Sequence, residues 1–517
     1  MKTLSKFLIC LLAGAPLFGQ NGLPQVSNFS YTEDLLNNQV TFTYDLDEPE
    51  NEACEVRIFY QAPGTSTFKK EITAQCTGDI GSGILQGAGK SVLYTYEPNE
   101  LISGSSAFKI VVDDGYEWSV EDVLDLIEKE NLESNLEFVE GARHRNSNPN
   151  HLKQVQDSIQ SLFEKEGWEL QVQTWMNGAY QAKNYIGKIQ GTTQDTVWYL
   201  MGGHYDSVAG SPGADDNGSA TAALMEAIRV LGKFGFKKTI RLVAFDMEED
   251  GLVGSTRYVS NIFPEGERLD GFLDWEMIGY YRDDPNSQTV PVGFSLLFPG
   301  AYGQLEADSF KGNFITNVAN ANSLALQNAF NSAAASWVPE LKIISVPVPG
   351  NGTIAPDLMR SDHAPFWIKG EPALMLTDGA NFRNPNYHEA TDVIDSIDFD
   401  FMEDVFKASI ATICELAELH HAGTDTLSYD RAVSVNFLEE KAISIYPNPT
   451  QNSLNIKAGD LKIDQIDLYN MEGKLVKSIT YAGNTLSRLD VGNLKKGFYS
   501  IKIKTDKGYW NSSFVKE

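Results

Sequence analysis

Five segments in the middle of the chain carry the acids and histidines that could perform chemistry. They span residues 202–208, 212–219, 244–255, 273–279 and 383–392. Most of them follow, or end, apolar runs of the kind that form buried strands. Ligands gather at the carboxyl ends of strands in open α/β sheets, where side chains far apart in the sequence can meet. These segments therefore predict one site built from several strand ends.

The first segment, GGHYDSV, places a histidine directly after an apolar run. A neutral imidazole is a good zinc ligand, and a carboxylate two residues later can accept its second ring N–H. We therefore predict that His204 binds a metal and that Asp206 orients it. Taken alone, the segment is explained more simply by a histidine that makes hydrogen bonds in a loop.

Two pairs of adjacent acids strengthen the case for a metal. Asp215 and Asp216 open a helical segment, where one acid could merely cap the helix. Two neighbouring carboxylates, however, repel each other unless a cation or a proton intervenes. Glu248 and Glu249 follow an apolar strand, so one of them can bind a metal while the other accepts a proton from water.

The remaining segments supply further candidate ligands. Glu276 lies between Trp275 and Met277 in an apolar stretch, where a charge without a partner is costly. The segment RNPNYHEATD contributes Tyr387 and His388, and the segment RSDHAPF precedes it in the chain. Together these segments could complete a metal site.

Composition excludes several classes of partner. The 517 residues carry a formal net charge of −29, from 41 Lys and Arg against 70 Asp and Glu. No basic run offers phosphate neutralisation, which argues against nucleic acid and anionic lipid surfaces as partners. With 42% hydrophobic residues, the chain has the composition of a folded protein, and about 150 residues per domain predicts two to four domains.

The first 20 residues have the pattern of a signal peptide. Lys2 and Lys6 precede an apolar stretch over residues 7–18. Because no small residue precedes Cys10, we expect a cleaved signal and not a lipoprotein. No later stretch reaches the ~20 apolar residues of a membrane helix. The protein is therefore predicted to be exported, with no membrane-spanning segment.

The chain after residue 20 divides into four segments that differ in their hydrophobic pattern. Alternating apolar residues over 21–116 predict a β-sandwich of immunoglobulin or fibronectin type. Residues 119–422 alternate helical patterns with continuous apolar runs, which indicates an α/β fold: a three-layer α/β/α domain with a mostly parallel central sheet. A polar linker over 423–441 and a small C-terminal β-sandwich over 442–517 complete the prediction.

Other residues offer weaker signals. Cys54 and Cys76 either form a disulfide in an oxidising compartment or remain buried thiols. The pair His420 and His421 is interpreted as a solvated helix end and not as a metal site. No GxSxG motif or Cys/His pair offers a rival nucleophile.

The phrases HYDSV, GADDNGSA, FDMEEDGLVGS, EMIGYY, RSDHAPFW and RNPNYHEATD together resemble the co-catalytic di-zinc exopeptidases of metallopeptidase family 28, which includes bacterial leucyl aminopeptidases. The resemblance covers about 200 residues. It implies five metal ligands that hold two zinc ions, with Asp216 bridging: His204, Asp216, Glu249, Glu276 and His388. It also implies that Glu248 is the general base and that Tyr387 hydrogen-bonds the oxyanion. Three further residues are expected to support the site from behind: Asp206, Arg360 and Asp362.

Such a site has a defined chemistry. Two cations about 3.5–4 Å apart can polarise the scissile carbonyl and lower the pKa of a bridging water. Glu248 would take the proton from that water and pass it to the leaving amine. Many family members have Asp where this chain has Glu276, so Asp274, two residues away, is a rival ligand. Nitrogen and oxygen ligands would also suit cobalt or manganese.

The C-terminal segment resembles a second family. The phrases YPNPT, LNI, LYNMEG and LKKGFYSI are similar to the C-terminal sorting domain of the type IX (Por) secretion system. The resemblance implies export by the type IX machinery across an outer membrane, followed by removal of the domain or attachment to the surface. The alternative is a small β-sandwich without a sorting role.

The predicted function is that of a secreted aminopeptidase that releases apolar N-terminal residues from peptides. The acids expected near the metals, Glu248, Glu276 and either Asp283 or Asp284, would attract an α-ammonium group. On the same fold, a carboxypeptidase or dipeptidase could instead clamp a carboxylate with one of two arginines, Arg360 or Arg383. A glutaminyl cyclase with one zinc, or a non-catalytic binding module, would fit the sequence less well.

Overall fold

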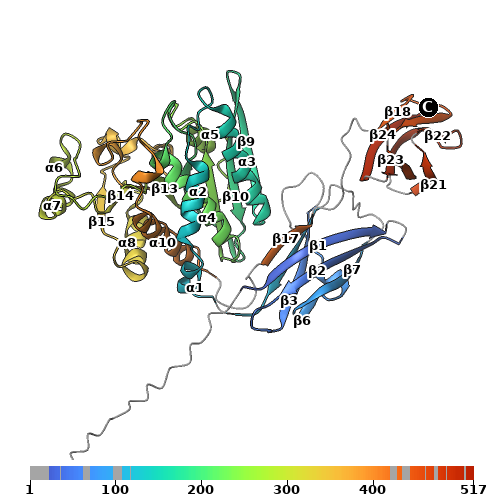
Figure 1. Cartoon of the computed structure of the whole chain (residues 1–517), viewed down its shortest axis with the longest axis horizontal. Helices are drawn as coiled ribbons and strands as arrows, with labels where there is room; N and C mark the ends of the chain where they lie inside the picture. The colour runs from blue at the N-terminus through green and yellow to red at the C-terminus, as the bar shows by residue number, and fades with distance from the viewer. Residues whose placement is uncertain are drawn as a thin grey trace, which may run out of the picture.

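The computed structural model describes residues 23–34, 37–61, 70–96, 107–116, 118–419, 428–432, 443–459, 461–470, 475–484, 486–505 and 508–517. Figure 1 shows an N-terminal β part in blue, a central α/β part from cyan to orange and a C-terminal β part in red. No helix in these ranges is long and apolar enough to cross a membrane. The predicted signal peptide and the pair His420 and His421 lie outside the described residues.

The N-terminal part is a β-sandwich. One sheet has the order β1-β2-β7-β5, and the other has the order β17-β8-β3-β4, with β6 also paired to β3. Their inward side chains form one core. The strands are β1 (Gln25–Asp34), β2 (Gln39–Asp47), β3 (Cys54–Gln61), β4 (Lys70–Glu71), β5 (Cys76–Gly78), β6 (Gly81–Ile84), β7 (Gly87–Thr95), β8 (Ala107–Asp113) and β17 (Ser428–Ala432).

Two details of this part bear on the sequence predictions. Strand β17 lies inside the segment that we expected to be an irregular linker, and it pairs antiparallel with β8. The alternation of its five residues is too short to separate a strand from a polar loop. Cys54 and Cys76 are free thiols, and the Cys76 Sγ donates to the Ile72 carbonyl at 3.2 Å. The possible disulfide is therefore not formed.

The central part is built on one eight-stranded sheet with the order β15-β14-β16-β13-β11-β12-β10-β9. The neighbouring strands β16, β13, β11 and β12 are parallel to one another, and β14 is parallel to β15. The pairs β14 with β16, β12 with β10 and β10 with β9 are antiparallel. The strands are β9 (Glu169–Asn177), β10 (Tyr180–Ile189), β11 (Gln194–His204), β12 (Lys238–Phe245), β13 (Arg268–Glu276), β14 (Ile315–Ala319), β15 (Ile343–Pro347) and β16 (Ala373–Thr377).

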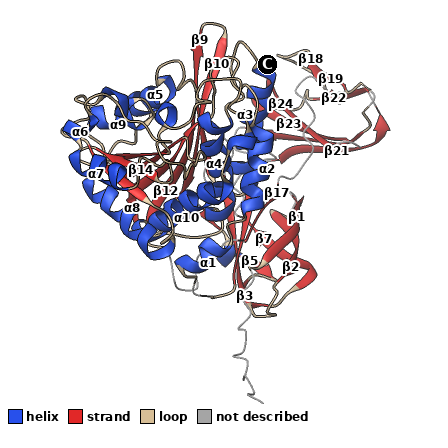
Figure 2. Ribbon diagram, turned by 60° about the vertical axis from the view of Figure 1, so that its left-hand side comes forward, coloured by secondary structure: helices blue, strands red, loops and turns tan. Residues whose placement is uncertain are grey.

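Helices cover both faces of this sheet (Figure 2). One core holds apolar side chains of α1–α4, α8 and α10, and the other holds those of α5–α7 and α9. The helices are α1 (Val120–Asp125), α2 (Lys129–Val139), α3 (Pro149–Lys165), α4 (Ala220–Leu231), α5 (Val253–Asn261), α6 (Phe294–Leu297), α7 (Pro299–Ala307), α8 (Leu324–Trp337), α9 (His363–Lys369) and α10 (Phe399–Leu416). The architecture confirms the predicted three-layer fold.

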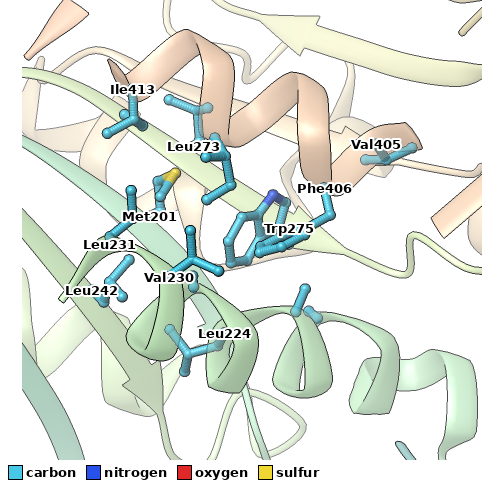
Figure 3. Packing of buried hydrophobic residues seen from close by; sticks show 14 of the residues in the cluster. Met201, Leu224, Val230, Leu231, Leu242, Leu273, Trp275, Val405, Phe406 and Ile413 are labelled. Atoms are coloured by element: carbon cyan, nitrogen blue, oxygen red, sulfur yellow. The ribbon is translucent and has the colours of Figure 1, made fainter. Parts of the chain in front are cut away.

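Continuous apolar runs form strands here because both faces are buried. Tyr199 and Met201 of β11 belong to one core, whereas Trp198 and Leu200 belong to the other. Figure 3 shows Trp275 of the central strand β13 packed between α4 and α10. Helices on both faces thus fix the strands whose carboxyl ends carry the candidate site.

The C-terminal part is a small β-sandwich, as predicted. Its two sheets have the orders β18-β19-β22 and β21-β20-β23-β24, and they enclose one apolar core. The strands are β18 (Ser444–Tyr446), β19 (Ser453–Lys457), β20 (Ile463–Asn470), β21 (Leu475–Asn484), β22 (Leu486–Asp490), β23 (Gly497–Thr505) and β24 (Gly508–Lys516).

Candidate active site

His204 is the last residue of β11, and it is buried at the carboxyl edge of the sheet. Gly202, two residues earlier, has φ of +144°, and a Cβ there would lie 1.9 Å from the Val243 carbonyl oxygen. Only glycine permits this approach of β11 to β12. The His204 Nε2 lies 3.3 Å from Glu276 Oε2 and 3.6 Å from Asp216 Oδ1, so one group of donor atoms forms here.

A second group of donor atoms adjoins the first. The His388 Nε2 lies 3.1 Å from Asp216 Oδ2 and 3.2 Å from Glu249 Oε2. Within each group of three residues the ligand atoms lie within 4.8 Å of one another. Because its two carboxylate oxygens approach different histidines, Asp216 belongs to both groups.

The chemistry of these donors fits zinc ions. Neutral imidazole and carboxylate are common zinc ligands. Among the described residues, neither His204 Nε2 nor Glu249 Oε1 has a hydrogen-bond partner, although both atoms are buried. Such atoms are costly unless something satisfies them. A cation between the carboxylates would do so and would also relieve their mutual repulsion.

The pKa directions agree with that conclusion. Burial, and then the neighbouring Asp216, raises the pKa of Glu249 to about 7. Burial opposes protonation of His388, but the carboxylates of Asp216 and Glu249 raise its pKa to about 10. The cluster therefore favours bound protons when it holds no other cation, and a divalent metal would displace them.

Glu248 stands beside both groups without belonging to either. Its Oε2 lies 3.9 Å from His204 Nε2, and burial raises the pKa of its carboxyl. It follows β12 in a loop in which Met247 has φ of +62°. A non-glycine residue in that region carries strain of about 1 kcal/mol or more, which is common at functional sites.

Asp206 holds this loop in place. Its carboxylate accepts hydrogen bonds from the backbone N–H groups of Glu248 at 3.1 Å and Glu249 at 3.3 Å. The hydrogen-bond partner of His204 Nδ1 is the Asp206 backbone carbonyl at 3.2 Å, and Oδ1 of the carboxylate that we expected as the acceptor lies 3.4 Å away. Asp206 thus connects the histidine to the two glutamates, a role that its spacing alone did not reveal.

Glu276 and Asp274 occupy different surroundings. Ser361 donates to Glu276 Oε2 at 2.8 Å, and Glu276 belongs to the first group of donors. Asp274 instead accepts hydrogen bonds from the backbone N–H of His363 at 2.9 Å, and lies 3.1 Å from its Nδ1. Asp362 is fully buried near Asp274 and belongs to neither group.

Several supporting residues escaped the sequence analysis. Asp392 accepts hydrogen bonds from the backbone N–H groups of Asp215 and Asp216 at 3.0 and 3.1 Å. The Asp215 carboxylate accepts from Gly279 N at 3.0 Å and from Asn384 Nδ2 at 2.8 Å. Asp392 ends the motif that contains His388, and that position was the one signal available for it.

Tyr387 lies between the second donor group and an arginine. Its ring stacks on that of His388 with the centroids 3.8 Å apart, and its hydroxyl accepts a hydrogen bond from Arg360 Nη2 at 2.8 Å. Arg360 Nη1 donates to Asn381 Oδ1 at 3.0 Å. Arg360 therefore already has partners, one of which is the tyrosine hydroxyl itself.

A largely apolar pocket opens beside Glu276, Tyr387 and Arg360. Its free volume is about 710 Å³, open mouth included. Most of its apolar walls come from the core that α5–α7 and α9 share with the sheet, and the wall residues are Val290, Pro291, Phe294, Leu305, Phe314, Ile344, Val346, Leu358, Met375 and Phe382. A concave pocket with mostly apolar walls and a few polar groups is typical of a ligand-binding site.

The other charged candidates lie elsewhere. Arg383 is buried behind the pocket wall, where its Nε donates to Gln288 Oε1 at 2.7 Å and its guanidinium lies 4.5 Å from the Phe314 ring centroid. Asp283 pairs with Lys311 at 3.0 Å. Neither Asp283 nor Asp284 lines the pocket.

Two family models match parts of this chain, and several known proteins are similar to it. Residues 184–413 match the model of peptidase family M28, and residues 444–517 match that of the secretion system C-terminal sorting domain. A probable zinc metalloprotease of Pyrenophora tritici-repentis is 28% identical over 334 residues, which cover 57% of this chain and 68% of that protein. Leupeptin-inactivating enzyme 1 of Streptomyces exfoliatus is 25% identical over 414 residues, 69% of this chain and 81% of that enzyme. The crystal structure of the LapA aminopeptidase of Legionella pneumophila has a TM-score of 0.44 at 21% identity, covering 58% of this chain and 76% of that one.

Proposed function

We propose that this protein, in which residues 184–413 match the model of peptidase family M28, is a hydrolase that acts on peptide bonds and, more specifically, an aminopeptidase with a two-zinc centre. One observation carries this proposal. Asp216 presents one carboxylate oxygen to each of two histidines, and each histidine also faces a glutamate. That arrangement suits two cations that share one ligand.

The proposed ligands divide into two sets that have Asp216 in common. One zinc would be held by His204, Asp216 and Glu276, and the other by Asp216, Glu249 and His388. Zinc bound there supplies a Lewis acid that polarises the scissile carbonyl and lowers the pKa of water. The bond of Asp274 to His363 supports Glu276 as the ligand and leaves Asp274 in a supporting role.

Glu248 is proposed as the general base. It is buried, it contacts the first donor group, and it is not itself among the proposed ligands. Its carboxylate takes a proton from the attacking water and returns it to the nitrogen of the leaving amine. Asp206 fixes the backbone of Glu248, so the base is held at a constant distance from the reacting atoms.

Tyr387 is proposed to donate a hydrogen bond to the carbonyl oxygen as negative charge develops on it. Arg360 donates to the oxygen of this hydroxyl, which leaves the hydroxyl proton directed elsewhere. A donor that is fixed before the reaction stabilises the oxyanion without reorganisation. Arg360 thus acts through Tyr387.

The direction of cleavage follows from what surrounds the pocket. Glu248 and Glu276 can stabilise the free α-ammonium group of a peptide beside an apolar side chain in the pocket. Arg383 is buried behind the wall, and Arg360 is already bonded to Tyr387 and Asn381. Arg383 is therefore out of reach of a terminal carboxylate, and Arg360, although it lines the pocket, would have to share its guanidinium with the two groups to which it already donates, which disfavours a carboxypeptidase or dipeptidase.

The two ends of the chain concern delivery of the enzyme. The sorting domain at 444–517 indicates type IX secretion to the exterior or the cell surface. We propose that residues 1–20 are the signal peptide for the first membrane and that the domain boundaries lie near 21–116, 119–422 and 442–517, with the stretch 423–441 between the last two.

Hydrolysis of peptides with free or blocked ends tests the proposal. The purified chain is expected to release leucine or phenylalanine from a tripeptide with a free amine, and to release glycine or aspartate poorly, because the pocket is apolar. Acetylation of the amine should abolish release, whereas amidation of the carboxyl end should not. Faster hydrolysis of the acetylated peptide, with loss upon C-terminal amidation, would instead favour a carboxypeptidase.

A further inference from the structure

Arg143 is a fully buried arginine in the loop between α2 and α3, and the proposed chemistry does not use it. Its guanidinium donates five hydrogen bonds of 2.8–3.1 Å, all to backbone carbonyls. The acceptors are the carbonyl oxygens of Val139, Gly141, Tyr205, Pro212 and Gly213. Within the part of the chain that the structure describes, none of its hydrogen-bond acceptors is a carboxylate.

Three of these carbonyls, those of Tyr205, Pro212 and Gly213, belong to the segments that carry His204 and Asp216. Tyr205 directly follows His204, and Gly213 lies three residues before Asp216. The backbone of Arg143 adds two bonds to the first segment: its N–H donates to Ser207 Oγ at 2.9 Å, and its carbonyl accepts from Ser207 N at 3.1 Å. Arg143 therefore ties the loop after His204 to the loop before Asp216.

Gly213 shows how closely the second loop approaches. Its φ is +61°, and a Cβ there would lie 2.9 Å from Arg143 Nη2. Glycine is the residue that adopts this conformation at low cost and leaves room for the guanidinium. The local backbone is thus shaped around the arginine.

The charge of Arg143 is matched by acids that it does not touch. Asp216 attracts it most strongly among the neighbouring carboxylates, followed by Asp392, Asp206 and Glu249. Burial lowers the pKa of Arg143 to about 10, so the side chain remains a cation at neutral pH. A buried cation without nearby anions would be strongly destabilising.

We infer that Arg143 is a positioning residue that holds the loops of His204 and Asp216 together, and that its charge offsets the repulsion among the acids before zinc binds. This inference rests on the proposed zinc centre. Once zinc is bound, the metal supplies the positive charge, so the contribution of Arg143 to stability should be larger in the zinc-free protein than in the zinc-loaded protein.

Differential scanning calorimetry of the full chain, with excess zinc and with EDTA at pH 8, tests this difference. Arg143→Met is expected to widen the gap in Tm between the two forms by about 5 °C relative to wild type. Arg143→Lys keeps the charge but loses most of the hydrogen bonds, so it should lower both Tm values and leave the gap unchanged. Ser207→Ala is the control that removes a hydrogen bond without altering charge, and it should also leave the gap unchanged.

Two results would overturn the role of the charge. One is an equal change in the Tm of the zinc-loaded and zinc-free forms of Arg143→Met, and the other is a Tm gap in Arg143→Lys as wide as that in Arg143→Met. If Arg143→Met does not fold, Arg143→Met/Asp392→Asn replaces it, because this pair keeps the wild-type net charge. The pair is expected to show a gap near that of wild type, and a gap about 5 °C wider than that of wild type would contradict the inference. A wild-type chain that binds no zinc would contradict the proposed function as well. If the wild type binds zinc but Arg143→Met lowers the Tm of both forms equally, only the role of Arg143 is contradicted.

Discussion

Replacement of Glu248 by glutamine is expected to lower kcat by about 10² or more, the usual scale for loss of a general acid or base. Glutamine has nearly the same shape but cannot take a proton from water. Because Glu248 belongs to neither group of proposed ligands, zinc content should stay at the wild-type level. Steady-state kinetics and metal analysis of the same preparation measure both quantities.

Glu226→Gln provides a matched control. Glu226 is also a buried glutamate, but it pairs with Arg229 on α4 at 2.6 Å, away from the proposed ligands. Its replacement should lower stability and leave kcat near the wild-type value. If Glu248→Gln retains full turnover, Glu248 is not the base and another group must accept the proton.

Asp216→Ala is expected to remove both metals and all measurable activity. Its two oxygens lie 3.6 Å from His204 Nε2 and 3.1 Å from His388 Nε2, so its loss takes one ligand from each site. Glu276→Ala removes a ligand from one site alone and should leave one zinc in place. Metal analysis by mass spectrometry distinguishes these outcomes.

Asp283→Ala controls for the loss of an acid. Asp283 pairs with Lys311 and lies outside the site, so this variant should keep the zinc content and the activity of wild type. Retention of both metals by Asp216→Ala would contradict the bridging role and would require a different assignment of the ligands.

The candidate metal ligands at the strand ends were predictable from the sequence because their positions depend on local signals. An apolar run without polar alternation indicates a strand buried on both faces, and His204, Glu249 and Glu276 each follow or end such a run. Parallel neighbours bring these ends to one edge of the sheet. The motif that contains His388 has no such local signal of its position, and its resemblance to a known family placed it in the site.

Contacts between distant loops were not predictable in this way. Arg143 lies in the segment GARHRN, and nothing in its spacing distinguishes it from a surface arginine. Its five acceptors are backbone carbonyls, which leave no trace in the pattern of side chains. Asp274 and Glu276 likewise could not be separated by sequence, because tertiary contacts distinguish them: His363 of α9 donates to Asp274, whereas Glu276 faces His204 and Ser361.

The last strand of the N-terminal sandwich, β17, was not predictable from the sequence either. The first eight strands alternate clearly enough to predict a sandwich, but β17 arrives from more than 300 residues later in the chain. A strand of five residues gains its stability from the sheet that it joins, and its own composition is typical of a linker. Only the tertiary partner, β8, identifies it as a strand.

Zinc content and activity, followed together while zinc is returned to the EDTA-treated wild-type chain, test whether catalysis depends on two bound zinc ions. The metal-free chain is expected not to release leucine from a free tripeptide. Activity should return with added zinc and reach its plateau at about two zinc ions per chain, because the two donor groups share Asp216. A purified chain that hydrolyses the peptide without any bound metal would contradict the account.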